Sequence, residues 1–282
     1  MKEKALYIIL VGCAAVLTAS DFQTKYCACT QIAVVDVGQG SGLYIRTEQG
    51  KEIIIDTGET TKTLRNISQF RYPWDRSIDV MFLTHADRDH IGMSIDIARR
   101  NTVTKVIVPP VETYDAVSRV LESEQNIVFA QAGNGISIDE VYINILWPNI
   151  FDISEKDGKK IDKNENSLVL LLNIHDVKIL VMGDAGTPTE ESLIKEYGHI
   201  LQSDILLVGH HGSRSSSSKK FVQIVSPTYS VVQVGADNRY GHPHPIVIQT
   251  LEKSGTRIFR TDIDGSIRFK INEQGISDII VR

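Results

Sequence analysis

The chain has 282 residues, of which 42% are hydrophobic and 23% are charged, and its formal net charge is -5. This length allows one large hydrophobic core or two small ones, and we expect a single domain. The acidic balance disfavours a broad surface that coats nucleic acid non-specifically. It does not exclude a nuclease, because bound metal ions add local positive charge that a residue count omits.

The N-terminus is typical of an export or anchoring segment. Two lysines precede an uncharged apolar stretch, residues 5–20. Such a segment indicates a secretory signal, a lipoprotein signal with lipid on Cys13, or an uncleaved membrane anchor; the alternative is a buried N-terminal helix. We therefore expect a protein of the cell envelope or a secreted one, with membrane association through the N-terminus. The expected segments are a leader at 1–20, a short linker at 21–30 and the folded domain at 31–282.

Short apolar runs separated by Gly, Asp and Asn predict a strand-rich α/β protein. In the first half of the domain, the predicted strands are 31–37, 43–46, 52–56 and 80–83, and the predicted helix is 91–100. The segment 151–166 is charged and rich in helix breakers, which indicates a surface loop.

Two apolar strands, 167–174 and 177–182, are expected to form a hairpin. The sequence Thr187-Pro188-Thr189-Glu190 then predicts a helix start, with Thr187 as N-cap, proline in the first turn and Glu190 completing a capping box. Further strands are predicted at 204–208 and 229–234.

The strongest chemical signal is the segment His-Ala-Asp-Arg-Asp-His at residues 85–90, which carries four potential metal ligands in six positions. It follows a predicted strand and precedes a predicted helix, so the ligands lie on a turn, where neighbouring side chains can converge on one point. Imidazole and carboxylate without cysteine suit a divalent ion held by nitrogen and oxygen, and two ions are readily accommodated.

Other polar residues follow later strands in the same way. Asp184 comes directly after the strand 177–182, and of the eight histidines all except His175 and His199 lie in loops after predicted strands. Loops at one edge of a sheet can gather side chains that are remote in sequence. We expect these groups to form one site.

Seven motifs occur in an order seen in a known family. They are DVGQG at 36–40, IDTG at 55–58, THADRDH at 84–90, NSLV at 166–169, GD at 183–184, GHHGS at 209–213 and YGHPHP at 240–245. With them the chain resembles metallo-β-lactamase-fold hydrolases, most closely the hydrolase domain of ComEC-type DNA-uptake proteins. The resemblance implies an α/β fold, a four-layer αββα sandwich in one domain, with a dinuclear metal site at the sheet edges.

The resemblance also implies roles for individual residues. One ion is expected on His85 and Asp87 and the other on Asp89 and His90, with Asp184 as the bridge. His210 is the expected last ligand, and His211, His242 and His244 are alternatives or proton donors. The full expected set comprises the metal ligands His85, Asp87, Asp89, His90, Asp184 and His210, the catalytic residues Asp89, His211 and His242, and the substrate-binding residues Asn166, Ser213, Tyr240 and His244.

Asp87 is a departure from the general superfamily motif, which has histidine at this position, and the histidine of the third motif is replaced near Asn166. A site richer in oxygen shifts the preference from zinc toward harder ions such as manganese. The expected cofactors are therefore two divalent ions, zinc or manganese. This composition weakens the prediction of β-lactam or thioester hydrolysis.

The expected function is a metal-dependent phosphodiesterase or DNase that uses a metal-activated hydroxide, with DNA or another phosphodiester as its partner. No protein partner can be inferred. One alternative is an esterase of small phosphodiesters, such as phosphocholine-bearing groups. A further alternative is a non-catalytic module that uses its metal structurally.

Overall fold

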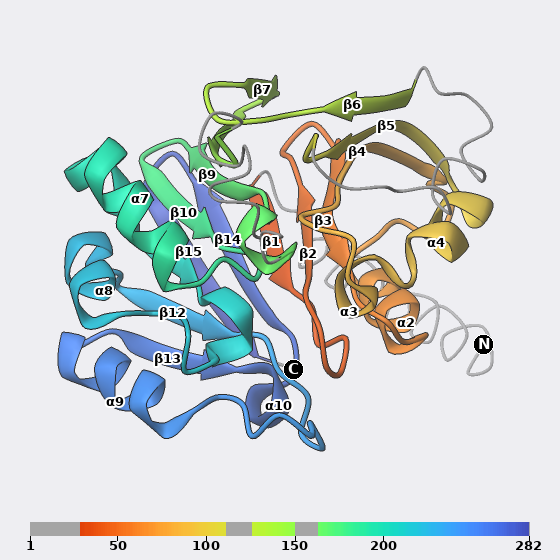
Figure 1. Ribbon diagram of the computed structural model, residues 1–282. Helices are drawn as coiled ribbons and strands as arrows, with labels where there is room; N and C mark the ends of the chain where they lie inside the picture. Colours follow the sequence, from red (N-terminus) through yellow and green to blue (C-terminus); the bar gives the residue numbers. More distant parts are fainter. Residues whose placement is uncertain (1–28, 111–125, 150–162, 282) are drawn as a thin grey trace, which may run out of the picture.

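The computed structural model describes residues 29–110, 126–149 and 163–281. The predicted leader, most of the linker and most of the loop at 151–166 lie outside the described residues. The described residues form two β-sheets packed face to face, with helices on the outer face of each (Figure 1). In that part of the chain, no helix combines the length and the apolar character that a bilayer span requires.

The first sheet has eight strands in the order β15-β14-β1-β2-β3-β4-β5-β6. Within it, β3 to β6 run parallel, so their carboxyl ends share one edge of the sheet. The strands are β1 (Thr30–Val34), β2 (Gly42–Arg46), β3 (Glu52–Thr57), β4 (Ser77–Phe82), β5 (Thr102–Val108), β6 (Ile127–Phe129), β14 (Ile267–Asn272) and β15 (Gly275–Val281).

The second sheet has seven strands in the order β13-β12-β11-β10-β9-β8-β7. Here β10 to β13 run parallel, and β9 and β10 form the predicted hairpin. The strands are β7 (Gly135–Ile138), β8 (Val141–Trp147), β9 (Val169–Ile174), β10 (Val177–Val181), β11 (Ile205–Leu207), β12 (Tyr229–Val232) and β13 (Arg257–Arg260).

Each sheet is apolar on its outer face as well as on the face that packs against the other sheet. Helices therefore cover the outer face of both sheets. The first sheet is covered by α2 (Lys62–Ser68), α3 (Arg88–Ile91) and α4 (Ser94–Arg100), and the second by α7 (Thr187–Tyr197), α8 (Lys219–Val225) and α9 (Pro245–Ser254). The remaining helical segments are short: η2 (Lys163–Asn166), η3 (Gly198–Leu201), η4 (Gly209–Gly212) and α10 (Thr261–Asp264).

Three clusters of buried side chains hold these layers together. The largest lies between the sheets and includes Phe82, Leu170 and Phe269. A second joins the second sheet to α7, α8 and α9, and a third joins the first sheet to α2 and α4. The order of layers is helix, sheet, sheet, helix, which confirms the αββα prediction.

Two details of the predicted helices were wrong, although α7 begins at Thr187, within one residue of the predicted start. The helix expected over 91–100 is broken into α3 and α4 around Gly92, because the backbone N–H of Met93 donates to the carbonyl of Gly58 and not to that of Asp89, which instead accepts the N–H of Ser41. The capping box at α7 does not form. Its N-cap is Gly186, and Glu190 instead accepts the backbone N–H groups of Ser217 and Ser218.

Candidate metal centre

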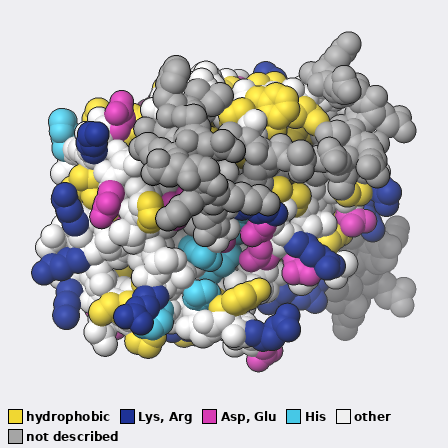
Figure 2. Space-filling view, in the orientation of Figure 1, with side chains coloured by type: hydrophobic (Ala, Val, Ile, Leu, Met, Phe, Trp, Pro, Cys, Tyr) yellow, Lys and Arg dark blue, Asp and Glu magenta, His cyan; other side chains and the backbone are white. Residues whose placement is uncertain are grey.

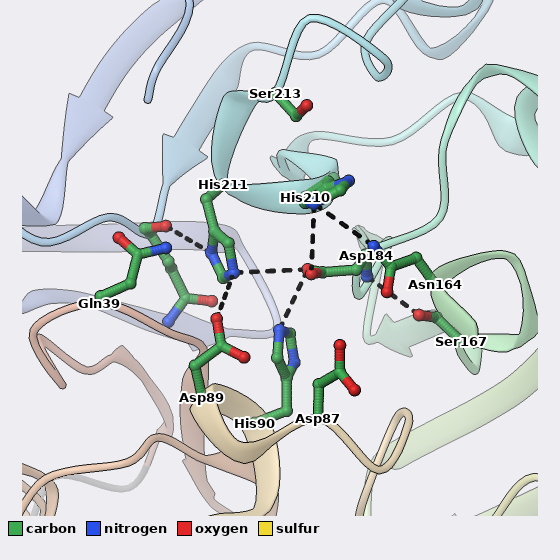
Figure 3. A network of polar contacts seen from close by, with 12 residues as sticks. Gln39, Asp87, Asp89, His90, Asn164, Ser167, Asp184, His210, His211 and Ser213 are labelled. Carbon is green, nitrogen blue, oxygen red and sulfur yellow. Dashed lines mark hydrogen bonds and ion pairs between the residues drawn. The ribbon is translucent and has the colours of Figure 1, made fainter. Parts of the chain in front are cut away.

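The candidate site lies where the edges of the two sheets meet. The loop after β4 and helix α3 supply His85, Asp87, Asp89 and His90, the loop after β10 supplies Asp184, and η4, which follows β11, supplies two histidines. Figure 3 shows Asp89, His90, Asp184 and His211 converging from the two sheets on one point. Because the contributing strands are parallel within each sheet, their carboxyl ends deliver the loops to the same edge.

Asp184 is at the centre of the cluster. Its Oδ1 lies 3.1 Å from Nε2 of His90 and 3.6 Å from Nε2 of His211. Its Oδ2 lies 3.8 Å from Nε2 of His85. All four side chains are buried, so one carboxylate faces three imidazoles in a space with little water.

Asp89 extends this cluster on one side, since its Oδ2 lies 3.2 Å from Nε2 of His211. Two groups of three side chains have ligand atoms within 4.8 Å of one another and could hold an ion, but both include His90, whose Nε2 can bind only one ion. The first group is His85, His90 and Asp184, and the second is Asp89, His90 and His211.

Hydrogen bonds fix the rings of His90 and His211. Nδ1 of His90 donates to Oδ2 of Asp56 over 2.7 Å, and Nδ1 of His211 donates to the backbone carbonyl of Gln233 over 2.9 Å. A carboxylate and a carbonyl oxygen only accept, so the Nδ1 proton is required in both rings. Each Nε2 therefore presents a lone pair to the centre when the ring is neutral, the arrangement that metal-binding histidines need.

The ring of His85 is oriented in the same way by hydroxyl groups. Oγ1 of Thr84 donates to Asp56 over 2.7 Å, so its lone pairs are available to Nδ1 of His85 at 3.1 Å. Oγ of Ser167 lies 3.3 Å from the same nitrogen. Nε2 of His85 is thus directed at Asp184.

Four atoms at the centre make no hydrogen bond within the described part of the chain: Nε2 of His85, His90 and His211, and Oδ1 of Asp184. Protonated rings can pair with the carboxylates, since Nε2 of His90 lies 3.1 Å from Oδ1 of Asp184 and Nε2 of His211 lies 3.2 Å from Asp89. With neutral rings these buried atoms have no donor between them, at a cost of about 1–3 kcal/mol for each unsatisfied group. Coordination of divalent ions would satisfy these atoms. The donor set of imidazole nitrogen and carboxylate oxygen fits zinc or manganese.

The electrostatics of the protein without metal support the same interpretation. Burial opposes a charge on His90, but Asp184 and Asp56 outweigh it and raise the pKa of His90 well above its ordinary value. The pKa of His211 is raised in the same way by Asp184 and Asp89. His85 differs, because burial and the neighbouring His90 lower its pKa to about 3. In the protein without metal, protons on His90 and His211 thus supply the positive charge that offsets the carboxylates, whereas a bound metal ion would supply it in their place.

Asp87 and His210 lie at the rim of the site. Asp87 is 40% exposed, with Oδ2 3.9 Å from Nε2 of His85 and Oδ1 3.9 Å from Nζ of Lys163. Nε2 of His210 lies 3.8 Å from Oδ2 of Asp184 and 3.4 Å from Nδ2 of Asn164. His210 is 26% exposed, whereas His211 is 3% exposed. The left-handed backbone at both residues, with φ of 49° and 53°, turns the two rings apart.

The residues expected to bind substrate are dispersed. The ring of His242 is 5.9 Å from that of His210, and the 66% exposed Tyr240 stacks on His242 at 5.7 Å. His244 caps α9, since its Nδ1 accepts the backbone N–H of Ile246. Ser213 is buried, and in Figure 3 its hydroxyl points away from Asp184. Asn166 is buried as well, in the same short helical segment as Asn164.

Three residues without an expected role are brought to the site by the structure. Asp56 orients His90, Asn164 approaches His210, and Gln39 lies in the loop whose Ser41 donates its backbone N–H to the carbonyl of Asp89 over 3.1 Å. A role for Asp56 could have been predicted from the sequence, because Asp56 ends a predicted strand. In the structure that strand is adjacent to the strand that precedes His85. The sequence held no such signal for Asn164, since it lies in a charged segment without periodicity.

Residues 35–235 match the metallo-beta-lactamase superfamily, and the chain belongs to this superfamily. The fold is also that of the metallo-beta-lactamase fold protein YhfI from Bacillus subtilis. The two structures align with a TM-score of 0.58 at 8% sequence identity, over 86% of this chain and 99% of that one. At such low identity the similarity concerns the fold alone.

Two relatives match most of this chain. The chain is 27% identical over 267 residues to ComE operon protein 3 of Bacillus subtilis, covering 85% of this chain and 33% of the relative. It is 30% identical over 246 residues to competence protein ComA of Neisseria gonorrhoeae, covering 87% of this chain and 33% of the relative. The resemblance to ComEC-type proteins is confirmed, and the chain spans about a third of the length of these relatives.

Proposed function

We propose that this protein is a metal-dependent phosphodiesterase that cleaves DNA at the cell envelope. The superfamily supports metal-dependent hydrolysis, and the names of the relatives support a substrate connected with competence. One observation of the structure carries the proposal most directly: the three Nε2 atoms and Oδ1 of Asp184 that converge without hydrogen-bond partners among the described residues.

The geometry supports a division of the ligands between two ions. His85 and the rim residue Asp87 would hold one ion and Asp89, His90 and His211 the other, with Asp184 within reach of both groups. His211 replaces His210 as the last ligand in this assignment, because Nε2 of His211 is the one within 3.2 Å of Asp89. His210 then lines the approach to the centre.

When bound, two such ions supply a water that ionises near neutral pH and a positive field for the phosphoryl oxygens. The residues of the chain do the rest. The backbone carbonyl of Gln233 fixes the ring of His211 through Nδ1, Asp89 can accept from water on the lone pairs that metal binding leaves free, and the rim residues His210 and His242 would lie on the approach of the substrate. Burial and the neighbouring histidines lower the pKa of His242, so its ring is neutral at pH 7 and offers one N–H to a substrate oxygen.

Hydrolysis of bis-p-nitrophenyl phosphate tests the proposal. The purified protein should turn over this diester with added manganese or zinc and stop with a chelator, and Asp184→Asn should lower kcat by at least about 100-fold because both ions lose a shared ligand. Absence of turnover with every divalent ion would refute the enzyme proposal and favour a module with a structural metal. A preference for phosphocholine esters over single-stranded DNA would refute the DNA half alone.

A further inference from the structure

A pocket of about 390 Å³ lies between α8, α9 and the start of α7, beside the metal centre. None of the seven sequence motifs points to a role for it. Its lining includes Thr187, Arg214, Ser217, Lys219, Thr250 and Lys253.

The pocket adjoins the candidate metal centre through the chain itself. Thr187 comes three residues after Asp184, and Arg214 comes three residues after His211. Three residues span at most about 11 Å, so the edge of the pocket begins close to the ligands. A substrate that extends beyond the metal centre on this side reaches the pocket.

The charge of the lining is one-sided. Arg214, Lys219 and Lys253 all line the pocket, and no Asp or Glu does so among the residues that the structure describes. None of the three cations takes part in an ion pair within that part of the chain. Figure 2 shows Lys and Arg side chains along the α8 and α9 side of the face that carries the histidines. In a protein with a net charge of -5, such a lining selects an anion.

The rest of the lining is apolar or hydroxylic. Val222, Ile246 and Val247 form apolar wall, and Ile246 is 49% exposed to the opening. A ligand that complements both the cationic and the apolar side chains of the pocket has an anionic group and a flat or apolar part. A nucleotide has both, since its phosphate meets cations and hydroxyls while its base covers apolar surface.

The loop that carries Arg214 is held in place before any ligand arrives. The backbone N–H and the hydroxyl of Thr187 both donate to the carbonyl of Ser215, over 2.7 and 2.9 Å. The buried Glu190 accepts the N–H groups of Ser217 and Ser218, and Ser216 Oγ donates to the carbonyl of Gly209 over 2.7 Å. A preformed lining reduces the ordering cost of binding.

We propose that this pocket binds a nucleotide of the substrate strand that lies beyond the scissile phosphodiester. The inference rests on the proposed function, and it adds that the substrate is a polynucleotide held at a second position rather than a small phosphodiester. The cations bind the backbone phosphate, and the apolar wall contacts the base or the sugar.

Binding of a fluorescent single-stranded oligonucleotide to the metal-free protein tests this without any turnover. Replacing Arg214, Lys219 and Lys253 together by Ala should weaken binding at least about tenfold and reduce the slope of log K against log salt by about 0.7 for each lost phosphate contact. The matched control is Lys220→Ala, because Lys220 is an exposed neighbour on α8 that does not line the pocket. Its binding curve should equal that of the wild type.

Three outcomes would overturn the inference: wild-type protein that does not bind the strand, a triple variant that binds it as the wild type does, or equal competition by inorganic polyphosphate of the same charge. The last would leave an anion site without preference for nucleotides. The proposed hydrolysis is judged separately with wild-type protein and bis-p-nitrophenyl phosphate. If that diester is cleaved, the triple variant should lower the ratio of kcat/KM for the oligonucleotide to that for the diester by at least about tenfold.

Discussion

Asp56 accepts a hydrogen bond from Nδ1 of His90 over 2.7 Å, and both side chains are buried. The same carboxylate accepts the backbone N–H and the hydroxyl of Thr84. Asp56 therefore joins strand β3 to the turn that carries the metal-ligand motif, and it fixes the direction of Nε2 of His90 without facing the centre itself. Partners of this kind determine how well a site holds its metal.

Asp56→Asn should weaken metal binding by about 10- to 100-fold, because the amide no longer attracts the Nδ1 proton of His90 as a carboxylate does. Titration against a chelating dye measures the affinity, and circular dichroism shows whether the fold is kept. An affinity equal to that of the wild type in a folded variant would contradict the role given to Asp56.

The two adjacent histidines should behave differently. His211→Ala should bind one ion fewer than the wild type, since its Nε2 lies near both Asp89 and Asp184. His210→Ala should keep both ions and lower kcat, because His210 lies at the rim. Metal content after dialysis, measured by atomic emission, separates the two variants. Loss of an ion in His210→Ala and not in His211→Ala would restore His210 as the ligand.

Metal binding should release protons at neutral pH. The pKa values of His90 and His211 are raised in the protein without metal, and a coordinating imidazole must be neutral. Affinity should therefore increase from pH 6 to pH 8. Calorimetry in two buffers with different ionisation enthalpies counts the released protons, and identical heats in both buffers would contradict the prediction.

The same raised pKa values make the stability of the metal-free protein fall with rising pH, whereas its affinity for metal increases. A raised pKa means that His90 contributes stability below its ordinary pKa of about 6.5, and this contribution is lost as the pH rises through the raised value. The increase in Tm on adding metal should thus grow with pH. Thermal unfolding with and without chelator at several pH values measures it.

The glycine-rich loop after β1 is packed against the site. A Cβ at Gly40 would lie 2.1 Å from the backbone oxygen of Asp89, whereas at Gly38 the nearest atoms are 4.0 Å away. Both glycines have positive φ, so Gly38→Ala carries backbone strain of about 1–2 kcal/mol and Gly40→Ala carries a clash in addition. Gly40→Ala should displace Asp89 and weaken metal binding, while Gly38→Ala should lower the Tm and keep the affinity. Equal affinities in the two variants would contradict this.

Glu52 should make stability depend on pH away from the site. Burial raises the pKa of Glu52 to about 7, although Arg71 at 2.5 Å acts in the other direction. The folded protein thus keeps a proton that the unfolded chain loses near pH 4.5, so stability falls between about pH 4.5 and 7. The change is on the order of 3 kcal/mol. Urea unfolding with chelator should show this fall in the wild type and a flatter profile in Glu52→Gln.

The strands could be predicted because their signal is local. Apolar runs such as 52–56 and 177–182 appear as β3 and β10 with nearly the same bounds. The start of α7 at Thr187 was predicted to within one residue, but its cap and the break between α3 and α4 could not be predicted in this way. The helix expected over 91–100 is interrupted because Met93 donates its backbone N–H to Gly58 in another loop, and Glu190 does not form its capping box because it accepts the backbone N–H of Ser217, a residue 27 positions away.

The superfamily was predicted from the sequence alone, and so was the candidate ligand segment 85–90 with Asp184, because spacing within a turn and motif order along a chain are local properties. Only the tertiary structure decided which of His210 and His211 faces Asp89. It also decided that Asp56 orients His90. Those relationships depend on left-handed backbone at two adjacent residues and on the register of parallel strands, which bring together atoms that no spacing in the sequence relates.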